Sequence, residues 1–196
     1  MKQLRPALMT FILLSAITGL IYPLLVTVIS QTFFPYAAQG SLLQAQGQLI
    51  GSELIGQNFT QDKYLWGRPS ATADHPYNPL ASSGTNLGPS NLQLRQMVQQ
   101  RRLQLNSSMP APIDLVTSSA SGLDPEISLA AAYFQQARIA RARRLTPLQV
   151  ATIINRYAEY PFLGIWGEAR VNVLLVNLAL DNTSVTLDRS SGFQPF

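Results

Sequence analysis

Residues 7–30 read ALMTFILLSAITGLIYPLLVTVIS and contain no charged side chain. A helix of about 20 mostly apolar residues is long enough to cross the ~30 Å hydrocarbon core of a bilayer. This run belongs to a longer uncharged stretch, because the chain has no Lys, Arg, Asp, Glu or His between Arg5 and Glu53. Only 12% of all residues are charged, about half of the ~25% found in average proteins. The sequence therefore predicts one transmembrane helix over residues 7–30.

A cleaved signal peptide is the alternative interpretation of this run. Its apolar core would span ~7–15 residues and would end in a small-x-small cleavage site. The core here is longer, and the best candidate site, Tyr36-Ala37-Ala38, has Tyr where a small residue is needed. We therefore interpret residues 7–30 as a permanent anchor. Within it, Pro23 lacks a backbone donor and predicts a kink near Thr18 and Gly19.

The charges on either side of the anchor predict its orientation. Lys2 and Arg5 precede it, and no charge follows until Glu53. The positive-inside rule then places residues 1–6 in the cytoplasm as a short stub. We expect a single-pass protein of the cell (inner) membrane whose remaining chain is extracytoplasmic, that is, periplasmic.

One side of the predicted helix carries the small and polar residues Ser15, Thr18, Gly19 and Tyr22. Their spacing of three and four residues places them on a common face. Ser15 and Gly19 form a small-x-x-x-small pair, which allows another helix to approach closely. We predict a partner-helix contact here, although small residues are also common in spanning helices that have no such contact.

Beyond the anchor, we expect a linker over residues 31–47, a small α/β (α+β) domain over residues 48–181 and a polar tail over residues 182–196. Strands are predicted within residues 48–59, 64–66, 113–117 and 171–180. A helix is predicted from residue 90 or 91 to about 106. A second starts at Asp124-Pro125-Glu126 and continues through the Arg-rich residues 138–144, and a third starts at Thr146 with a capping box and ends before Pro161.

Residues 67–91 (GRPSATADHPYNPLASSGTNLGPSN) form a long stretch rich in Gly, Pro, Asn and Ser. Loops of more than about 12–15 residues are uncommon in compact domains and are usually functional or disordered. We expect consecutive turns here. A surface that docks on a partner and a loop that packs only on its own domain are both consistent with this composition.

The sequence contains little that predicts catalysis. The single histidine, His75, would have to be the base of any Ser-His-Asp triad, and no nucleophile motif accompanies it. Cysteine is absent, and we find no metal-ligand spacing and no phosphate-binding loop. The net charge of +4 is too small and too dispersed for nucleic-acid binding. We interpret Arg138, Arg141, Arg143 and Arg144 as a solvated helix end, with a docking patch for an acidic partner as the alternative.

Several motifs are similar to those of a known family. They include Arg5-Pro6-Ala7, Gly67-Arg68-Pro69-Ser70-Ala71, Ser83-Gly84-Thr85-Asn86-Leu87-Gly88 and the segments 51–57, 77–79, 116–125 and 171–181. In this order they resemble the C subunit of the Kdp-type potassium-transporting P-type ATPase over about residues 5–181. The resemblance implies a non-catalytic, single-span subunit that assembles or stabilises the complex and raises the ATP affinity of the ATPase subunit.

The implied partners are a channel-like potassium-binding subunit and a P-type ATPase subunit in the same membrane. We expect no cofactor of the chain's own, with ATP handled by the ATPase subunit, because the predicted orientation separates the domain from cytoplasmic ATP. The candidate docking residues lie in the long loop: Arg68, Ser70, Tyr77, Asn78, Gly84, Asn86 and Gly88. Two alternatives stay open, namely an extracytoplasmic assembly factor of another membrane complex and a membrane-anchored hydrolase that uses His75.

Overall fold

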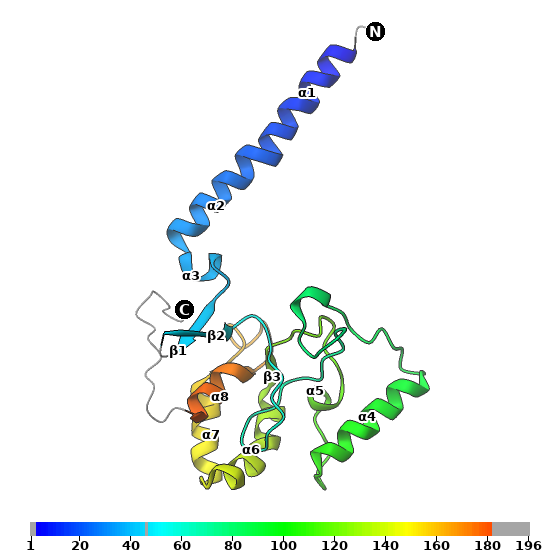
Figure 1. Cartoon of the computed structure of the whole chain (residues 1–196), viewed down its shortest axis with the longest axis vertical. Helices are drawn as coiled ribbons and strands as arrows, with labels where there is room; N and C mark the ends of the chain where they lie inside the picture. The colour runs from blue at the N-terminus through cyan, green and yellow to red at the C-terminus, as the bar shows by residue number, and fades with distance from the viewer. Residues whose placement is uncertain (1–2, 46, 182–196) are drawn as a thin grey trace. The chain divides into compact units, whose positions relative to one another are not determined.

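The computed structural model describes residues 3–45 and 47–181 (Figure 1). The chain divides into two compact units, one comprising the residues up to Leu42 and the other beginning at Leu43. The first holds the long apolar helix, and the second is a small mixed domain of helices and strands. The predicted polar tail, 182–196, lies outside the described residues.

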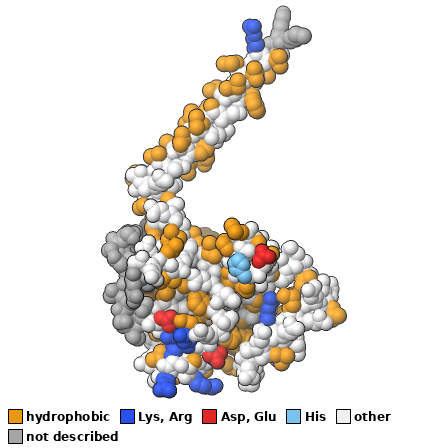
Figure 2. Space-filling model, viewed as in Figure 1, with side chains coloured by type: hydrophobic (Ala, Val, Ile, Leu, Met, Phe, Trp, Pro, Cys, Tyr) orange, Lys and Arg blue, Asp and Glu red, His pale blue; other side chains and the backbone are white. Residues whose placement is uncertain are grey.

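The N-terminal helix is long and apolar enough to cross a membrane, and it runs continuously from Leu4 to Phe33. It consists of α1 (Leu4–Ala16), the π-helical turn η1 (Ile17–Ile21) and α2 (Tyr22–Phe33). Figure 2 shows apolar side chains along its whole length. The kink from Pro23 is predicted near Thr18 and Gly19, and the helix has this π-helical turn at that place, in which the N–H of Tyr22 bonds to the carbonyl of Ile17. A π-turn re-pairs backbone groups where the regular ladder is interrupted.

Residues 31–47 contain more regular structure than a linker. The end of α2 is followed by α3 (Pro35–Ala38) and by β1 (Leu42–Ala45). β1 pairs with β2 (Gln48–Ser52) in a two-stranded sheet. The prediction of strand structure within 48–59 is thus confirmed for β2, but its partner strand precedes it instead of lying within the same segment.

The core of the domain lies between a three-stranded antiparallel sheet and three helices. The sheet has the order β3-β5-β4, with β3 at Glu126–Ser128, β5 at Arg170–Asn172 and β4 at Ala158–Glu159. The helices are α6 (Leu129–Arg143), α7 (Pro147–Arg156) and α8 (Val173–Asp181), which cluster together in Figure 1. Ile127 and Val171 face each other across the sheet, and both are buried in the core with Ile139, Val150 and Ile154.

Two helices begin where the sequence predicts. Asn91 caps α4 (Leu92–Leu105) by accepting a hydrogen bond from the N–H of Gln93. Thr146 and Gln149 form the expected capping box at the start of α7, with both reciprocal bonds present. These termini were predictable because the cap is encoded by residues within one turn.

The sequence predicts a helix that starts at Asp124-Pro125-Glu126, but a short strand precedes the helix. Glu126–Ser128 pairs with β5 as β3, and the helix begins only after Ser128, whose Oγ accepts from the N–H of Ala131 at 3.2 Å. The carboxylate of Asp124 accepts from the N–H of Glu126 at 3.0 Å and so closes a turn instead of capping a helix. Tertiary strand pairing overrides the local helix signal.

The strand predicted at 113–117 is also wrong, and the one predicted at 171–180 is correct only for its first two residues. Ile113–Val116 forms the short helix α5. In the second segment only the first residues belong to β5, and α8 follows directly, with Asn172 Oδ1 accepting from the N–H of Leu175 at 3.1 Å. A buried apolar run has no periodicity that separates strand from helix, so the sequence VNVLLVNLAL is ambiguous in this respect.

Residues 64–66 are not a strand, because side-chain amides bind their backbone instead of a neighbouring chain segment. Leu65 donates to Asn177 Oδ1 at 2.7 Å and accepts from Asn177 Nδ2 at 2.9 Å. Trp66 makes the same pair of bonds with Gln135, at 2.9 and 3.0 Å. We call these two pairings the amide clamps. They hold the segment against α6 and α8 and bury Leu65 completely.

The Arg-rich end of α6 is largely part of the fold. Arg138 lies over the ring of Trp66 at 3.7 Å and donates to the carbonyls of Asp62 and Tyr64. Burial lowers its pKa to about 10. Arg143 pairs with the carboxylate of Asp181 at 2.7 Å. The interpretation as a solvated helix end therefore fails for these two residues and fits only the exposed Arg141 and Arg144.

Candidate functional site

The long loop 67–91 is held against residues 118–124 by polar contacts near its start. The guanidinium of Arg68 pairs with the carboxylate of Asp124 at 3.1 Å and donates to the carbonyl of Ser118 at 3.3 Å. The hydroxyl of Ser70 donates to the carbonyl of Gly122 at 2.7 Å. These bonds join two segments that are distant in sequence, so they fix the loop to the domain.

Tyr77 is the buried centre of this loop. Its hydroxyl donates to the carbonyl of Arg68 at 2.5 Å, and its N–H donates to Ser70 Oγ at 2.9 Å. The ring lies where side chains at Gly56 and Gly67 would have to be. Burial raises the pKa of Tyr77 to about 12, and the nearby carboxylate of Asp124 acts in the same direction. Tyr77 therefore holds the loop closed as a neutral phenol.

The polar groups in the middle of the loop also form hydrogen bonds within the loop. Asn78 donates from its backbone to Thr72 Oγ1 at 3.1 Å and from its side chain to the carbonyl of Ala73 at 3.2 Å. Its side-chain oxygen accepts from the N–H of Leu80, at the start of the short 3₁₀ helix η2 (Pro79–Ala81). Asn78 is thus buried as a structural residue, whereas Leu80 is 96% exposed.

The last three candidate residues differ in their surroundings. A Cβ at Gly84 would lie 2.8 Å from the carbonyl oxygen of Ala120, so the close approach of two backbones requires glycine there. A Cβ at Gly88 would meet nothing within 4 Å. Asn86 is exposed and has a positive φ of 53°. Only Asn86 and Gly88 therefore lack an evident packing role.

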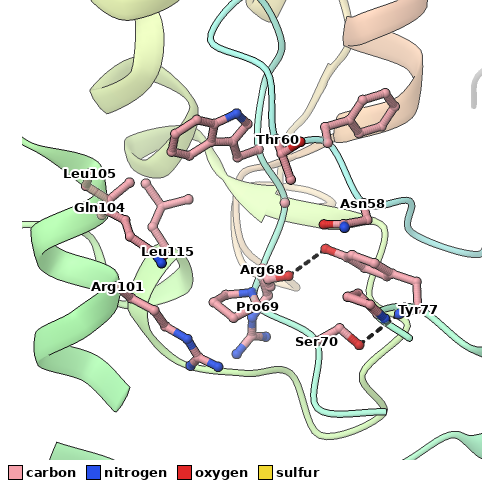
Figure 3. A pocket seen from close by; sticks show the side chains of 14 residues that line it. Asn58, Thr60, Arg68, Pro69, Ser70, Tyr77, Arg101, Gln104, Leu105 and Leu115 are labelled. Atoms are coloured by element: carbon pink, nitrogen blue, oxygen red, sulfur yellow. Dashed lines mark hydrogen bonds between the residues drawn. The ribbon is translucent and has the colours of Figure 1, made fainter. Parts of the chain in front are cut away.

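A pocket of about 450 Å³ lies between this loop and α4 (Figure 3). Of the predicted docking residues, Arg68, Ser70 and Tyr77 line it. Its wall combines aromatic and aliphatic side chains with amides, hydroxyls and two arginines, and none of the described residues contributes a carboxylate to it. The other lining residues are Asn58, Phe59, Thr60, Trp66, Gly67, Pro69, Pro76, Arg101, Gln104, Leu105 and Leu115.

Arg101 is the pocket residue that the sequence analysis missed. Its guanidinium donates to the carbonyl of Val116 at 3.0 Å and to Ser118 Oγ at 3.1 Å. Within residues 3–45 and 47–181 it has no carboxylate partner, in contrast to Arg68, which is paired with Asp124. Burial lowers the pKa of Arg101. The pocket therefore carries one positive charge that the described chain leaves uncompensated. In sequence, Arg101 stands in a helix rich in Gln and Arg, where nothing distinguishes it from its neighbours.

The predicted helix-contact residues Ser15, Thr18, Gly19 and Tyr22 are exposed along the N-terminal helix. Thr18 and Gly19 lie in η1, where the turn is wider than in an α-helix. The hydroxyl of Thr18 donates to the carbonyl of Leu14 at 2.7 Å, so its donor is used within the helix. A Cβ at Gly19 would meet nothing within 4 Å. The open surface at Gly19 is what a partner helix could occupy.

His75 is exposed on the long loop, and its backbone carbonyl accepts from Thr72 Oγ1 at 2.7 Å. In the described part of the chain its ring has no hydroxyl or carboxylate within hydrogen-bonding distance, so no triad is assembled around it. The same residues contain no cluster of three or more His, Cys, Asp or Glu side chains that could hold a metal ion.

Comparison with known proteins agrees with this arrangement of an apolar helix followed by a small domain. A family model described as "K+-transporting ATPase, c chain" (KdpC) matches residues 4–182. A protein of Variovorax paradoxus named "Potassium-transporting ATPase KdpC subunit" is 54% identical over 91% of this chain and 95% of its own length. Proteins with the same name from Serratia proteamaculans and Herpetosiphon aurantiacus are 51% and 53% identical, over 92% and 90% of this chain and 98% and 94% of their own lengths. The chain therefore belongs to the KdpC family, the c chain of the K⁺-transporting ATPase.

Proposed function

We propose that this chain is a non-catalytic accessory subunit of a potassium-transporting ATPase complex, required for its assembly and stability. The observation that carries this proposal is the family match over residues 4–182, which includes both the apolar helix and the domain. The partners are a channel-like subunit that conducts K⁺ and a P-type ATPase subunit that binds and hydrolyses ATP. The chain sits in the inner membrane with its N-terminus in the cytoplasm, as Lys2 and Arg5 indicate.

The domain docks on the channel-like subunit through the pocket beside α4. Arg101 contributes a half-buried positive charge that has no carboxylate partner among the described residues. Burying a charge is costly unless it is paired. An acidic side chain of the partner would supply the missing charge, and the aromatic wall around it would contact apolar groups beside that side chain. The long loop takes part through Arg68, Ser70 and Tyr77, which line the same pocket.

The N-terminal helix packs on a helix of the complex through the side that carries Ser15, Gly19 and Tyr22. Gly19 leaves open space at this surface, which permits a close backbone approach. An effect of the chain on ATP affinity is transmitted through this helix, because it is the part of the chain that reaches the cytoplasmic side in the proposed topology. Such coupling requires an element with two states that both sites influence.

Replacement of Arg101 tests the docking pocket. We expect Arg101→Gln to lower the amount of this chain that copurifies with the other subunits, and Arg101→Lys to retain most of it. Arg102→Gln is the matched control, because Arg102 is the exposed neighbour on the same helix. Circular dichroism of each variant checks that the domain is folded. Normal copurification of a folded Arg101→Gln variant would remove the pocket from the docking surface.

Omission of the chain tests the function itself. We expect the remaining subunits to lose potassium-stimulated ATPase activity, and adding back the full chain to restore it. Full activity of a complex without this chain would contradict an accessory role in assembly and stability.

A further inference from the structure

The segment between β4 and β5 exposes an unusual concentration of large apolar side chains. Residues 160–166 read YPFLGIW. Tyr160, Phe162, Leu163, Ile165 and Trp166 are 65%, 67%, 72%, 75% and 63% exposed. Monomeric soluble proteins rarely present such a contiguous patch without using it for an interaction. We call residues 160–166 the apolar hairpin.

The apolar hairpin is a folded turn with a defined shape. Phe162 and Trp166 exchange two backbone hydrogen bonds, of 2.9 and 3.1 Å. Leu163 and Gly164 have positive φ values of 52° and 72°, and the N–H of Ile165 donates to the carbonyl of Phe162 at 3.1 Å, so residues 162–165 form a tight turn inside the hairpin. The rings of Phe162 and Trp166 stack with their centroids 6.3 Å apart. The exposed side chains therefore project from a turn whose backbone conformation is fixed by hydrogen bonds.

The charge around the hairpin limits what it can bind. Residues 160–167 contain no charged side chain. At its base, Arg170 pairs with Glu126 and Glu159, each at 3.1 Å, and Glu168 is exposed two residues after Trp166, so the surroundings of the tip carry more negative than positive charge. A partner recognised by charge has nothing to bind at the tip. The tip therefore binds something apolar. Polar groups must lie close by to form hydrogen bonds with the indole N–H of Trp166 and the hydroxyl of Tyr160.

The bilayer that holds the anchor is an apolar environment close to the domain. The spanning helix ends at Phe33 and the domain unit begins at Leu43. Even fully extended, residues 34–42 span at most about 30 Å. The radius of gyration of a domain of this size is only about 14 Å. The short connection therefore keeps the domain close to the bilayer surface, where Trp and Tyr are enriched.

We propose that the apolar hairpin inserts its tip into the interfacial layer of the bilayer that holds the anchor, with Phe162, Leu163, Ile165 and Trp166 among the lipid chains. The binding is carried by apolar area and not by charge, and because the carboxylates at the base repel anionic headgroups, zwitterionic lipid is bound at least as well as anionic lipid. The hairpin forms a second, reversible membrane contact that limits the rotation of the domain about its tether.

The two tryptophans of the chain allow a direct test, since Trp66 lies half-buried beneath Arg138 and Trp166 lies in the hairpin. The full chain is reconstituted in phosphatidylcholine vesicles with brominated acyl chains. In the Trp66→Phe variant we expect the bromines to reduce the fluorescence of Trp166 about twofold, as for a tryptophan at the interface. In the matched Trp166→Phe variant, the fluorescence of Trp66 should change by less than about a tenth.

A second variant shows whether Trp166 is quenched because the hairpin inserts into the bilayer or only because the domain lies close to it. Ile165→Ser in the Trp66→Phe background changes an exposed side chain, so the fold is retained, and we expect it to abolish most of the quenching. Half a molar salt should not reduce the quenching, and added phosphatidylglycerol should not increase it. Unquenched Trp166 in vesicles would overturn the proposal. If Trp166 is protected only in the assembled complex, the hairpin binds a protein partner and the lipid contact is equally overturned. Neither result bears on the assembly role.

Discussion

The side chain of Asn177 is 1% exposed and pairs with both polar groups of the Leu65 backbone. Gln135 does the same for Trp66. Each amide thus performs the task of a neighbouring strand, which is to satisfy one donor and one acceptor of a buried segment. Asn177 could have been noticed in sequence, because it is a polar residue inside an otherwise apolar run, whereas Gln135 stands beside Gln136 and has no such signal. What could not be read there is which segment they bind.

Replacement of Asn177 by Leu should be strongly destabilising. Leu fills a similar volume but leaves the N–H and the C=O of Leu65 buried without partners, at a cost of about 1–3 kcal/mol each. The measurement is the free energy of unfolding in urea with the protein in detergent. The control is Gln99→Leu, on the exposed side of α4, which should change it by less than about 0.5 kcal/mol. An unchanged unfolding midpoint for Asn177→Leu would show that the clamp is dispensable.

Two glycines of the long loop form a matched pair for a second prediction. Gly84→Ala places a Cβ 2.8 Å from the carbonyl oxygen of Ala120, and forcing these backbones apart should cost about 1–3 kcal/mol of stability. Gly88→Ala enters open space and should leave stability within about 0.5 kcal/mol. Thermal unfolding of the two variants makes the comparison. Equal effects would mean that the loop is not packed on residues 118–124 as described.

Tyr77 makes part of the stability dependent on pH. Its pKa is about 12 in the folded protein and about 10 in an unfolded chain. The folded state therefore holds this proton more tightly, so the contribution is complete below pH 10 and is lost as the pH rises from about 10 to about 12. The difference in unfolding free energy between the wild type and Tyr77→Phe should shrink over this interval. A difference that stays constant from pH 9 to 12 would contradict the raised pKa.

At the scale of elements, the sequence analysis was correct where residues within one turn determine the structure. It was wrong where pairing with a segment distant in sequence determines it. The caps of α4 and α7 lie within one turn of their helices and were predicted correctly. The stretch 124–128 carries a local helix signal, yet it pairs with β5, more than forty residues later. The same limit applies to the site, because the pocket depends on Arg101 and on a loop whose path over residues 118–124 is set by tertiary contacts.

The N-terminal helix provides the prediction that belongs to an element. Gly19→Leu fills the open surface and should weaken recovery of the chain with its partner subunits by several-fold, because close helix packing in membranes depends on small residues. Thr10→Leu is the control, since Thr10 lies five residues before Ser15 on α1, which places it about 140° around the helix from the contact face. Copurification from mild detergent measures both. Equal recovery of both variants would assign the contact to another side of the helix.

At the scale of the whole molecule, the chain is an anchor and a domain joined over residues 34–42. If the anchor and the domain each contact the complex separately, residues 34–42 affect assembly mainly through their length. Each doubling of a flexible loop costs only about 0.6 kcal/mol. The domain should then tolerate a longer connection to the membrane.

Insertion of six Gly/Ser residues between Gly40 and Ser41 tests this independence. We expect recovery of the assembled complex to fall by less than about threefold, since the entropic cost of the longer tether is below about 0.6 kcal/mol. The ATP dependence of the assembled complex is measured in parallel. A complete loss of assembly would show that the anchor and the domain must be held in one rigid geometry.

The four threonines of the N-terminal helix have a consequence for how the complex is made. Thr10, Thr18, Thr27 and Thr32 each donate to the carbonyl four residues earlier, at 2.7–2.8 Å. Their hydroxyls therefore demand nothing from a neighbour in hydrocarbon, where an unsatisfied polar group is costly. These four residues therefore do not oblige the newly made subunit to find a partner before its helix enters the bilayer. We expect insertion of the helix to precede assembly with the other subunits.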